Sequence, residues 1–213
     1  MRAPAGRVRV SMYADTYHGL LRGAFSAFAD RWPDIQVNVT FSEDPAHLMT
    51  EPYDVTFRIE PLPDSAMVAR KIYTIDPAVY ASPKFLERHR APEEPRDLLD
   101  LPCITLARFG NMWELRNRDR VETLYIKPRF VFSSVPLMTE LMVGGHGAGL
   151  VQRKIALPYL ETGRLVQLLP EWNGPRHDLF ILTAGRQVPQ RVRIFVDFIR
   201  DFLETAKTPQ PDR

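Results

Sequence analysis

The first seventy residues of this chain alternate between strand-like and helix-like patterns, with only short connections between them. Apolar and polar side chains alternate over residues 8–12, 35–41 and 54–59, which is typical of strands. Between the first two segments, apolar residues over 17–32 recur at spacings of three and four, which indicates one broad helical face that ends at Pro33. Because short strand–helix–strand connections form right-handed crossovers, this alternation predicts a parallel sheet covered by helices.

The rest of the chain predicts further elements of both kinds. Ser42 to Pro45 can cap a short helix, and the tail at 208–213 is expected to be frayed. We expect extended segments at 68–81, 103–107, 122–126, 129–133, 148–152 and 178–183, and helices after Ser82, from Ser133 to Gly144 and after Pro189.

The composition excludes several classes of protein. Lys and Arg number 28 against 26 Asp and Glu, with no basic run, so an electrostatic surface for nucleic acid is not expected. No apolar stretch approaches the roughly 20 residues that cross a bilayer, and no apolar run follows the charged N-terminus. A single cysteine, Cys103, excludes an internal disulfide and is interpreted as a buried structural thiol. These features predict a cytoplasmic protein without a membrane partner.

The motifs of common enzymes and metal sites are missing. The glycines between Gly144 and Gly149 follow a predicted helix and precede a strand, the reverse of a dinucleotide-binding loop, so they are interpreted as a helix C-cap and a turn. The five histidines are scattered without metal-ligand spacing, and no nucleophile elbow or phosphate loop is present. We therefore expect no catalytic residues, no metal and no cofactor.

Polar side chains gather where predicted strands give way to helices. In open parallel sheets, ligands bind beyond the carboxyl ends of the strands, where free backbone N–H groups of helix N-termini also lie. Each residue also has a structural interpretation, as a helix cap or, for Arg58, as an ion pair. Trp113 is interpreted as a packing residue. The joint placement favours a ligand site at these junctions: Asp15, Thr16, Ser42, Arg58, Ser133 and Ser134.

An ordered set of short motifs covers nearly the whole chain. Trp32-Pro-Asp-Ile35 matches a Tyr-Pro-x-Ile pattern, Tyr53 to Ile59 an Asp-Val-Ala-Ile-Arg pattern, and Ala81 to Leu86 an Ala-Ser-Pro-x-Tyr-Leu pattern. Further segments follow in the expected order: Gly145–Leu150, Gly163–Val166, Leu169-Pro170, Trp172 and Val192–Ile199. Together they resemble the C-terminal regulatory domain of LysR-type transcription regulators.

The resemblance implies an α/β fold of two Rossmann-like lobes, of the type 2 periplasmic-binding-protein architecture, joined by two crossover segments. Lobe I would comprise residues 1–77 and 181–213, and lobe II residues 78–180, with a small-molecule effector in the cleft between them. The family's effector-contacting positions fall on Asp15, Thr16, Ser42, Arg58, Ser82, Ser133 and Ser134. The family commonly has Ser or Thr near Asp15 and Asn-Asp at Ser133-Ser134, so this sequence departs in both places.

The resemblance also implies partners. Such domains pair side by side as homodimers, and the full-length proteins form tetramers and bind DNA through an N-terminal winged helix-turn-helix. Nothing in this sequence resembles that DNA-reading segment, so DNA contact is expected only through a part that this chain lacks. The helices beginning at Tyr17 and Pro136 are the expected pairing elements.

Three alternatives remain open at this point. A free-standing solute-binding receptor shares the implied fold but needs a secretory signal. An enzyme on the same scaffold needs a reactive group in the cleft, where only Asp15 and Arg58 are charged. A purely structural dimerisation module with an empty cleft is the third. Effector identity and charge, and activation or repression, are not encoded in any motif.

Overall fold

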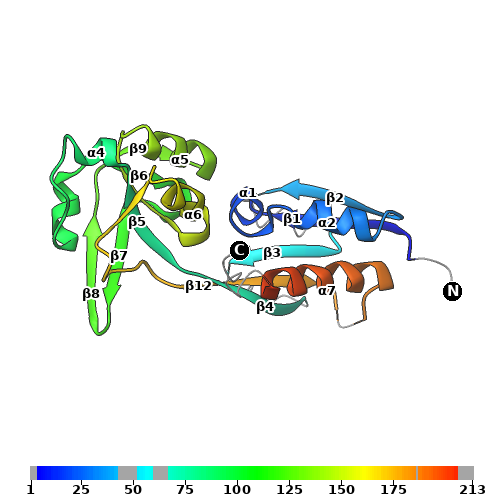
Figure 1. The fold of residues 1–213 in the computed structure, drawn as a ribbon. Helices are drawn as coiled ribbons and strands as arrows, with labels where there is room; N and C mark the ends of the chain where they lie inside the picture. Colours follow the sequence, from blue (N-terminus) through cyan, green and yellow to red (C-terminus); the bar gives the residue numbers. More distant parts are fainter. Residues whose placement is uncertain (1–3, 43–51, 60–66, 186, 206–213) are drawn as a thin grey trace. The chain divides into compact units, whose positions relative to one another are not determined.

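The computed structural model describes residues 4–42, 52–59, 67–185 and 187–205. The chain divides into two compact units, and it passes between them twice (Figure 1). Unit 1 comprises Met1–Thr74 with His177–Arg213, and unit 2 comprises Ile75–Arg176. The boundaries expected from the sequence lay after residues 77 and 180. The observed boundaries, after Thr74 and Arg176, lie a few residues earlier. The short helix expected after Ser42 and the tail at 208–213 lie outside the described residues.

Unit 1 is built around a five-stranded sheet with the strand order β2-β1-β3-β12-β4. Strand β1 pairs in parallel with β2 on one side and with the central strand β3 on the other, and β12 runs antiparallel to β3. The elements of this unit are β1 (Gly6–Met12), α1 (Ala14–Thr16), the π-helix η1 (Tyr17–Leu21), α2 (Ala24–Arg31), β2 (Ile35–Phe41), β3 (Val55–Ile59), β4 (Val68–Ile75), β12 (His177–Thr183) and α7 (Gln190–Thr205).

The alternation along β1 separates an apolar face of this sheet from a polar one. Val8, Val10 and Met12 are fully buried and lie on the face that α7 covers. There α7 and α2 pack together through Phe195 and Phe28, whose rings meet edge to face at 5.2 Å. Successive strand residues point to opposite faces, so residues 9, 11 and 13 lie on the other side of the sheet.

The single helix expected over 17–32 is wrong, because the structure divides this segment into two helices, η1 and α2. Helical structure begins earlier, at Ala14, continues as the π-helix η1 and stops at Arg22. Gly23 then adopts a φ of 83°, a left-handed conformation that glycine tolerates and that no α-helix contains. The apolar spacing continues across this break, which is why periodicity alone predicted one helix.

Unit 2 contains a second five-stranded sheet, with the order β11-β5-β10-β6-β9, and a separate hairpin of β7 and β8. Strands β10, β6 and β9 run parallel, and β5 is antiparallel to β10. Its elements are β5 (Pro77–Ala81), α4 (Pro83–Leu86), η2 (Pro95–Asp100), β6 (Cys103–Leu106), η3 (Ala107–Phe109), β7 (Met112–Asn117), β8 (Arg120–Tyr125), β9 (Pro128–Phe132), α5 (Val135–Val143), β10 (Ala148–Gln152), α6 (Arg153–Glu161) and β11 (Val166–Leu168).

Each face of the unit 2 sheet has its own apolar core. On one face, Tyr80 of β5 and Ile104 of β6 pack with Met138 and Met142 of α5. The opposite face packs against α4, η2 and the hairpin, with Trp113 fully enclosed. The sheet is therefore the central layer of unit 2.

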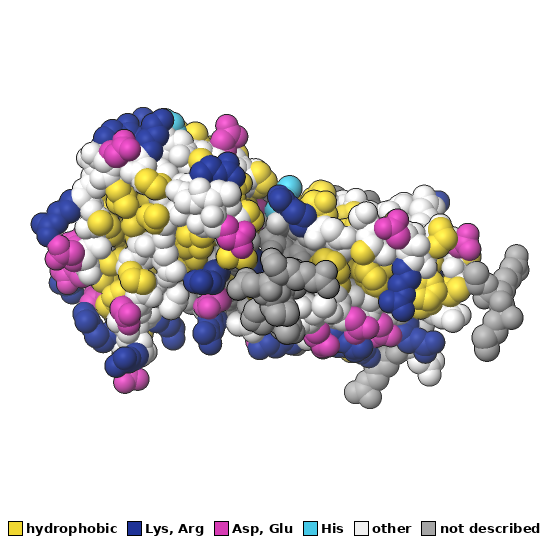
Figure 2. Space-filling model, in the orientation of Figure 1, with side chains coloured by type: hydrophobic (Ala, Val, Ile, Leu, Met, Phe, Trp, Pro, Cys, Tyr) yellow, Lys and Arg dark blue, Asp and Glu magenta, His cyan; other side chains and the backbone are white. Residues whose placement is uncertain are grey.

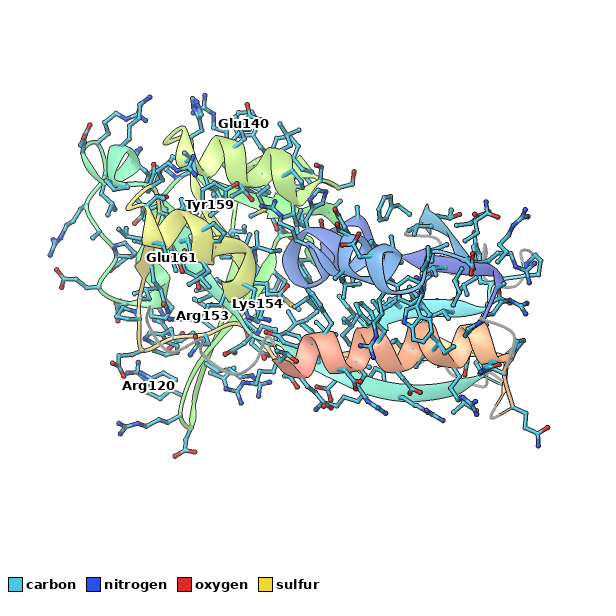
Figure 3. All side chains as sticks on the ribbon, turned by 45° about the vertical axis from the view of Figure 1, so that its right-hand side comes forward. Arg120, Glu140, Arg153, Lys154, Tyr159 and Glu161 are labelled. Atoms are coloured by element: carbon cyan, nitrogen blue, oxygen red, sulfur yellow. The ribbon has the colours of Figure 1, made fainter. Side chains whose placement is uncertain are left out.

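The elements β7, η2, α6 and β11 were not predicted from the sequence. The α6 pattern is obscured because Pro158 lies inside the helix and Arg153 and Lys154 occupy its first turn, where acidic residues are usual. Figure 3 shows both cations at the start of α6 and Tyr159 near its end. Packing against β5 and β10 overrides these unfavourable local signals.

A substitution at Gly149 of β10 can test how tightly α5 packs on the sheet. A Cβ at this position would lie 2.5 Å from Met138 Cε and 2.6 Å from Met142 Sδ. We predict that Gly149→Ala lowers the denaturant midpoint by the equivalent of about 1–3 kcal/mol, as overpacking typically does. Gly185→Ala is the control, because no atom of the described residues lies within 4 Å of the point that its added Cβ would occupy. Equal midpoints for the two variants in urea denaturation would contradict this account of the packing.

Candidate functional site

The carboxyl ends of β1 and β2 bring together three of the predicted site residues. Met12 lies beside Phe41 in the parallel register, and the backbone N–H of Ser42 donates to Met12 O at 3.1 Å. Asp15 and Thr16 follow in α1, with exposed fractions of 8% and 5%. Two predicted side chains are thus buried at this edge, and Ser42 lies beside them at the end of the neighbouring strand.

Arg58 of β3 is a buried cation at the same edge, with 2% of its surface exposed. Its Nη1 donates to its neighbour's carbonyl, Phe57 O, at 2.7 Å, and its Nη2 donates to Ser11 Oγ at 3.1 Å. The guanidinium carbon lies 5.1 Å from the centre of the Tyr13 ring. Burial lowers the pKa of Arg58, and the neighbouring tyrosines Tyr13 and Tyr53 oppose that shift only in part. The group stays protonated at neutral pH, because the arginine guanidinium is not deprotonated in proteins.

Arg58 belongs to a row of polar side chains on the face of the sheet opposite α7. Ser11 and Thr56 are direct register partners in β1 and β3, and both are fully buried. Thr56 Oγ1 has no hydrogen-bond partner among the described residues. At the other end of the row, Arg9 forms a forked ion pair with Asp54, at 3.2 Å from Nε to Oδ2 and 3.2 Å from Nη2 to Oδ1.

The ion pair changes the ionisation of Asp54. Burial raises the pKa of this carboxyl, but the hydrogen bonds from the Arg9 side chain and backbone outweigh burial and bring the pKa below its ordinary value. Asp54 is therefore fully ionised at neutral pH. Asp54 forms its ion pair with Arg9 and not with Arg58.

Ser133 and Ser134 occupy the corresponding edge of the unit 2 sheet. They follow β9, which runs parallel to β6 and ends beside it, with Phe132 paired to Leu106. Ser134 caps α5, because its hydroxyl accepts a hydrogen bond from the Leu137 backbone N–H at 3.5 Å. Ser133 is exposed, so its side chain is available to a ligand.

Gln152 lies at this edge too and was missed by the sequence analysis. It ends β10, which runs parallel to β6, and its Nε2 is buried without a hydrogen-bond partner among the described residues. The signal was present, since Gln152 is a polar residue directly after an apolar strand. It escaped notice because the helix that follows, α6, was not predicted.

Ser82 does not join Ser133 and Ser134. β5 runs antiparallel to β10, so its carboxyl end lies beside Ala148, at the edge where β10 and β6 begin. Ser82 is 1% exposed, and as the N-cap of α4 its hydroxyl accepts a hydrogen bond from Phe85 N at 3.3 Å. Ser82 and the Ser133–Ser134 pair thus lie at opposite edges of one sheet, separated along the strands by about 13 Å for a five-residue strand.

Cys103 and Trp113 have structural roles. Both are buried in the core between the unit 2 sheet and the hairpin, and the Trp113 indole N–H donates to Thr105 Oγ1 at 3.4 Å. Burial raises the pKa of the Cys103 thiol to about 12. The glycines after α5 form a helix end, as expected, with Gly145 at a φ of 81° and its N–H donating to Met142 O.

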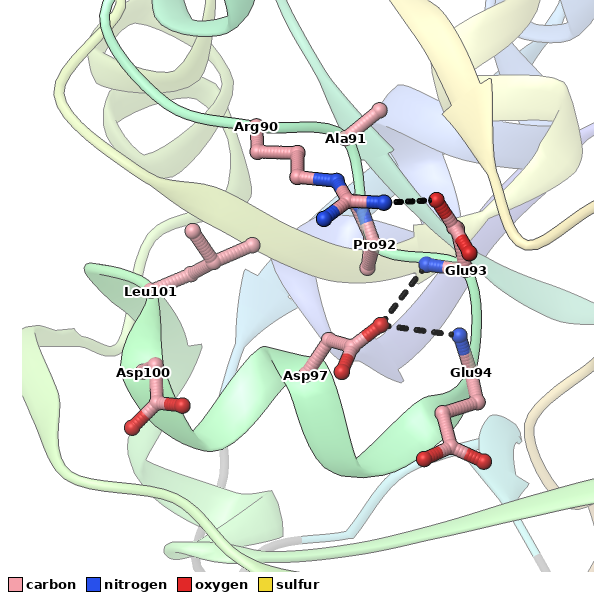
Figure 4. A pocket seen from close by; sticks show the side chains of 8 residues that line it. All are labelled: Arg90, Ala91, Pro92, Glu93, Glu94, Asp97, Asp100 and Leu101. Carbon is pink, nitrogen blue, oxygen red and sulfur yellow. Dashed lines mark hydrogen bonds and ion pairs between the residues drawn. The ribbon is translucent and has the colours of Figure 1, made fainter.

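A pocket of about 500 Å³ lies elsewhere in unit 2, beside η2 (Figure 4). Four carboxylates line it, but local structure accounts for three of them, because Glu94 and Asp97 form the capping box of η2 and Glu93 pairs with Arg90. Asp97 accepts hydrogen bonds from the backbone N–H groups of Glu93 and Glu94 at 2.8 and 3.0 Å. Among the described residues, no group of three or more His, Cys, Asp and Glu side chains is arranged to hold a metal.

The described surface carries mixed charges. Figure 2 shows Lys and Arg side chains interspersed with Asp and Glu on the drawn face of each unit. No described helix has both the length and the apolar character needed to span a membrane.

Comparison with known proteins identifies the family. Residues 2–204 match the model of the LysR substrate binding domain. A helix-turn-helix transcriptional regulator of Xanthomonas campestris is 29% identical over 191 residues, which cover 86% of this chain and 55% of the relative. PtxR of Pseudomonas aeruginosa is 26% identical over 204 residues, which cover 94% of this chain and 65% of PtxR. This chain therefore spans less than two thirds of the length of these relatives.

Solved structures agree with this match. The regulatory domain of CrgA from Neisseria meningitidis has a TM-score of 0.85 at 25% identity, covering 94% of this chain and all of that one. Full-length AphB, the Vibrio cholerae virulence activator, has a TM-score of 0.82 at 28% identity, covering 93% of this chain and 69% of AphB. The chain belongs to the LysR substrate-binding-domain family, with a fold of the type 2 periplasmic-binding-protein kind. The match over residues 2–204 makes it a substrate-binding domain of the kind found in LysR-type regulators.

The Cys103 environment predicts an unreactive thiol. Because the thiolate is the nucleophile, a pKa near 12 leaves almost none of it at pH 8. We expect iodoacetamide at pH 8 to leave the folded protein unmodified by mass spectrometry and to alkylate it fully in guanidinium chloride. The control is Ser133→Cys in a Cys103→Ala background, which places a thiol at an exposed position and is alkylated in the folded state. Rapid modification of Cys103 in the native protein would refute its burial.

The Arg9–Asp54 pair predicts a pH-dependent contribution to stability. Asp54 has a lowered pKa in the folded state, so its contribution is complete above the ordinary carboxyl value of about 4 and is lost as the pH falls through the folded value. We expect Asp54→Asn to lower the denaturation midpoint at pH 7, and this deficit to shrink below pH 4. Glu114→Gln, which breaks an exposed pair with Arg116, should have little effect at either pH. A deficit independent of pH would show that the charge of Asp54 contributes nothing.

Proposed function

We propose that this chain binds a small-molecule effector at the carboxyl edge of the unit 1 sheet. The observation that carries the proposal is the set of buried polar side chains collected there: Asp15, Thr16 and Arg58, with Ser42 beside them. Buried polar groups cost free energy unless they find partners, and their concentration at the end of parallel strands is what a polar-ligand site requires. Ser133 and Ser134, at the matching edge of the unit 2 sheet, are proposed as further effector contacts.

The regulatory step is proposed for the full-length protein. An effector that binds one conformation of the domain more tightly than another shifts the population toward it, by no more than its difference in affinity. In a protein that also carries a DNA-reading segment, such a shift changes how that segment meets DNA. Family membership supports this proposal, since the relatives are helix-turn-helix transcriptional regulators by name.

We also propose that the domain pairs with a second copy of itself. Strands β2 and β9 each form one of the two edges of their sheet, and each exposes a large apolar side chain, Phe41 at 54% and Val131 at 54%. Exposed edges with apolar side chains favour association. The pairing expected from the sequence, through the helices after Tyr17 and Pro136, uses elements next to these strands. Sedimentation of Phe41→Glu against the unchanged chain tests the proposal, and an unchanged dimer fraction would exclude β2.

Effector binding is tested first by thermal denaturation in the presence of a metabolite library. A ligand at 100 times its Kd stabilises the folded state by about 2.7 kcal/mol, which raises the melting temperature measurably. We expect at least one metabolite to do so. If none stabilises the chain, the domain is a structural dimerisation module instead.

Calorimetry with that metabolite then tests the site residues. We expect Thr16→Ala and Ser133→Ala each to weaken binding by up to about tenfold, the equivalent of one hydrogen bond. Ser82→Ala is the matched control, because this hydroxyl lies at the opposite edge of the unit 2 sheet and caps α4. It should reduce stability by about 1 kcal/mol as a lost cap and leave affinity unchanged. A loss of affinity in Ser82→Ala alone would move the site to the other edge.

A further inference from the structure

The polar face of the unit 1 sheet carries two arginines in different electrostatic situations. Arg9 is partly exposed and pairs with Asp54. Arg58 is buried, and the groups among the described residues that raise its pKa are the tyrosines Tyr13 and Tyr53 and not a carboxylate. Its hydrogen bonds go to the neutral acceptors Phe57 O and Ser11 Oγ. The more deeply buried cation is therefore the one without a counter-charge in the described structure.

Such an arrangement is costly unless a ligand completes it. An ion removed from water loses several kcal/mol of hydration free energy, which neutral acceptors offset only in part. The Tyr13 ring at 5.1 Å adds a cation–π attraction of about 0.5–2 kcal/mol. The lowered pKa of Arg58 reflects the same incomplete compensation.

The groups around Arg58 can donate to an anion. The two hydrogen bonds that Arg58 makes to described residues use the terminal nitrogens Nη1 and Nη2, and neither uses Nε. Ser11 Oγ accepts from Arg58, so the Ser11 hydroxyl hydrogen remains able to donate. Thr56 Oγ1, the register partner of Ser11, is buried without a partner among the described residues. One cation and two hydroxyls thus converge on one part of the sheet.

We propose that Arg58, with Ser11 and Thr56, binds a carboxylate group of the effector, so that the effector of this chain is a carboxylic acid. This inference rests on the proposed function and names its ligand class. The planar guanidinium matches a carboxylate in a forked geometry. A phosphate, which carries close to two negative charges, fits less well, because one arginine supplies one charge and the Asp15 carboxyl is buried at the end of the adjoining strand.

The test uses arginine Nε–Hε signals in nitrogen-15 NMR spectra of the whole chain. Arg58→Gln assigns the Arg58 signal by its loss, and the Arg9 signal is an internal control on the same sheet face. The probes are sodium acetate, acetamide as the neutral isostere, sodium phosphate, and sodium chloride at matched ionic strength. We expect acetate to shift the Arg58 signal saturably with a millimolar Kd, and acetamide, chloride and the Arg9 signal to show no such response.

Variants separate binding from folding. Arg58→Lys keeps the positive charge but removes the planar guanidinium, and it should weaken acetate binding severalfold. Arg58→Gln removes the charge as well and should weaken acetate binding more than tenfold. In both variants the binding is read from the signals of Ser11 and Thr56. An unchanged Arg9 signal in both variants shows that the sheet remains folded. The proposal is overturned if acetate and acetamide act alike, if Arg9 responds as Arg58 does, or if phosphate binds more tightly than acetate.

The outcome is also separable from that of the effector screen. A neutral or cationic effector, together with an Arg58 signal that acetate does not move, overturns the carboxylate assignment and leaves the proposed function intact. Saturation of Arg58 by acetate, with no metabolite that stabilises the chain, retains an anion site and overturns the proposed effector function.

Discussion

The parallel pairing of β1 with both β2 and β3 is the constraint on which the candidate site in unit 1 depends. Parallel strands end at the same edge, so this pairing aligns Thr16, Ser42 and Arg58 although they are far apart in sequence. The same pairing makes Ser11 and Thr56 register partners and brings Ser11 within hydrogen-bond distance of Arg58. If β3 were shifted by one residue, Arg58 would face the apolar side of the sheet, beneath α7.

The sequence predicted those parts of the fold in which local pattern and tertiary packing agree. The strands at 35–41 and 54–59 were found from the alternation of apolar and polar residues, and the strand at 178–183 from its short apolar run. The break at Gly23 was missed because periodicity does not record φ, and α6 was missed because its stability comes from contact with β5 and β10, not from its own residues.

The prediction of the candidate site residues was limited by strand direction, which the sequence does not reveal. A residue at a strand end can be recognised locally, but the edge at which that strand ends depends on its direction, which only pairing determines. Ser133 and Ser82 have the same local signature, a serine between a strand and a helix, and they lie at opposite edges because β5 runs against β10. Gln152 shows the converse, since its strand direction places it at the predicted edge although no capping pattern marks it.

The residues on the polar face of the unit 1 sheet bear on both the folding stability of the chain and the proposed binding of a ligand. A protein selected for stability alone could fill positions 11, 56 and 58 with apolar side chains, which in other proteins is often neutral or stabilising relative to buried charge. The Arg9–Asp54 pair shows that this same face can satisfy a cation internally when a carboxylate is placed in register. Arg58 has no such carboxylate among the described residues, although β1 and β3 offer positions for one. We infer that the desolvation cost of Arg58 is offset when an anion binds beside it.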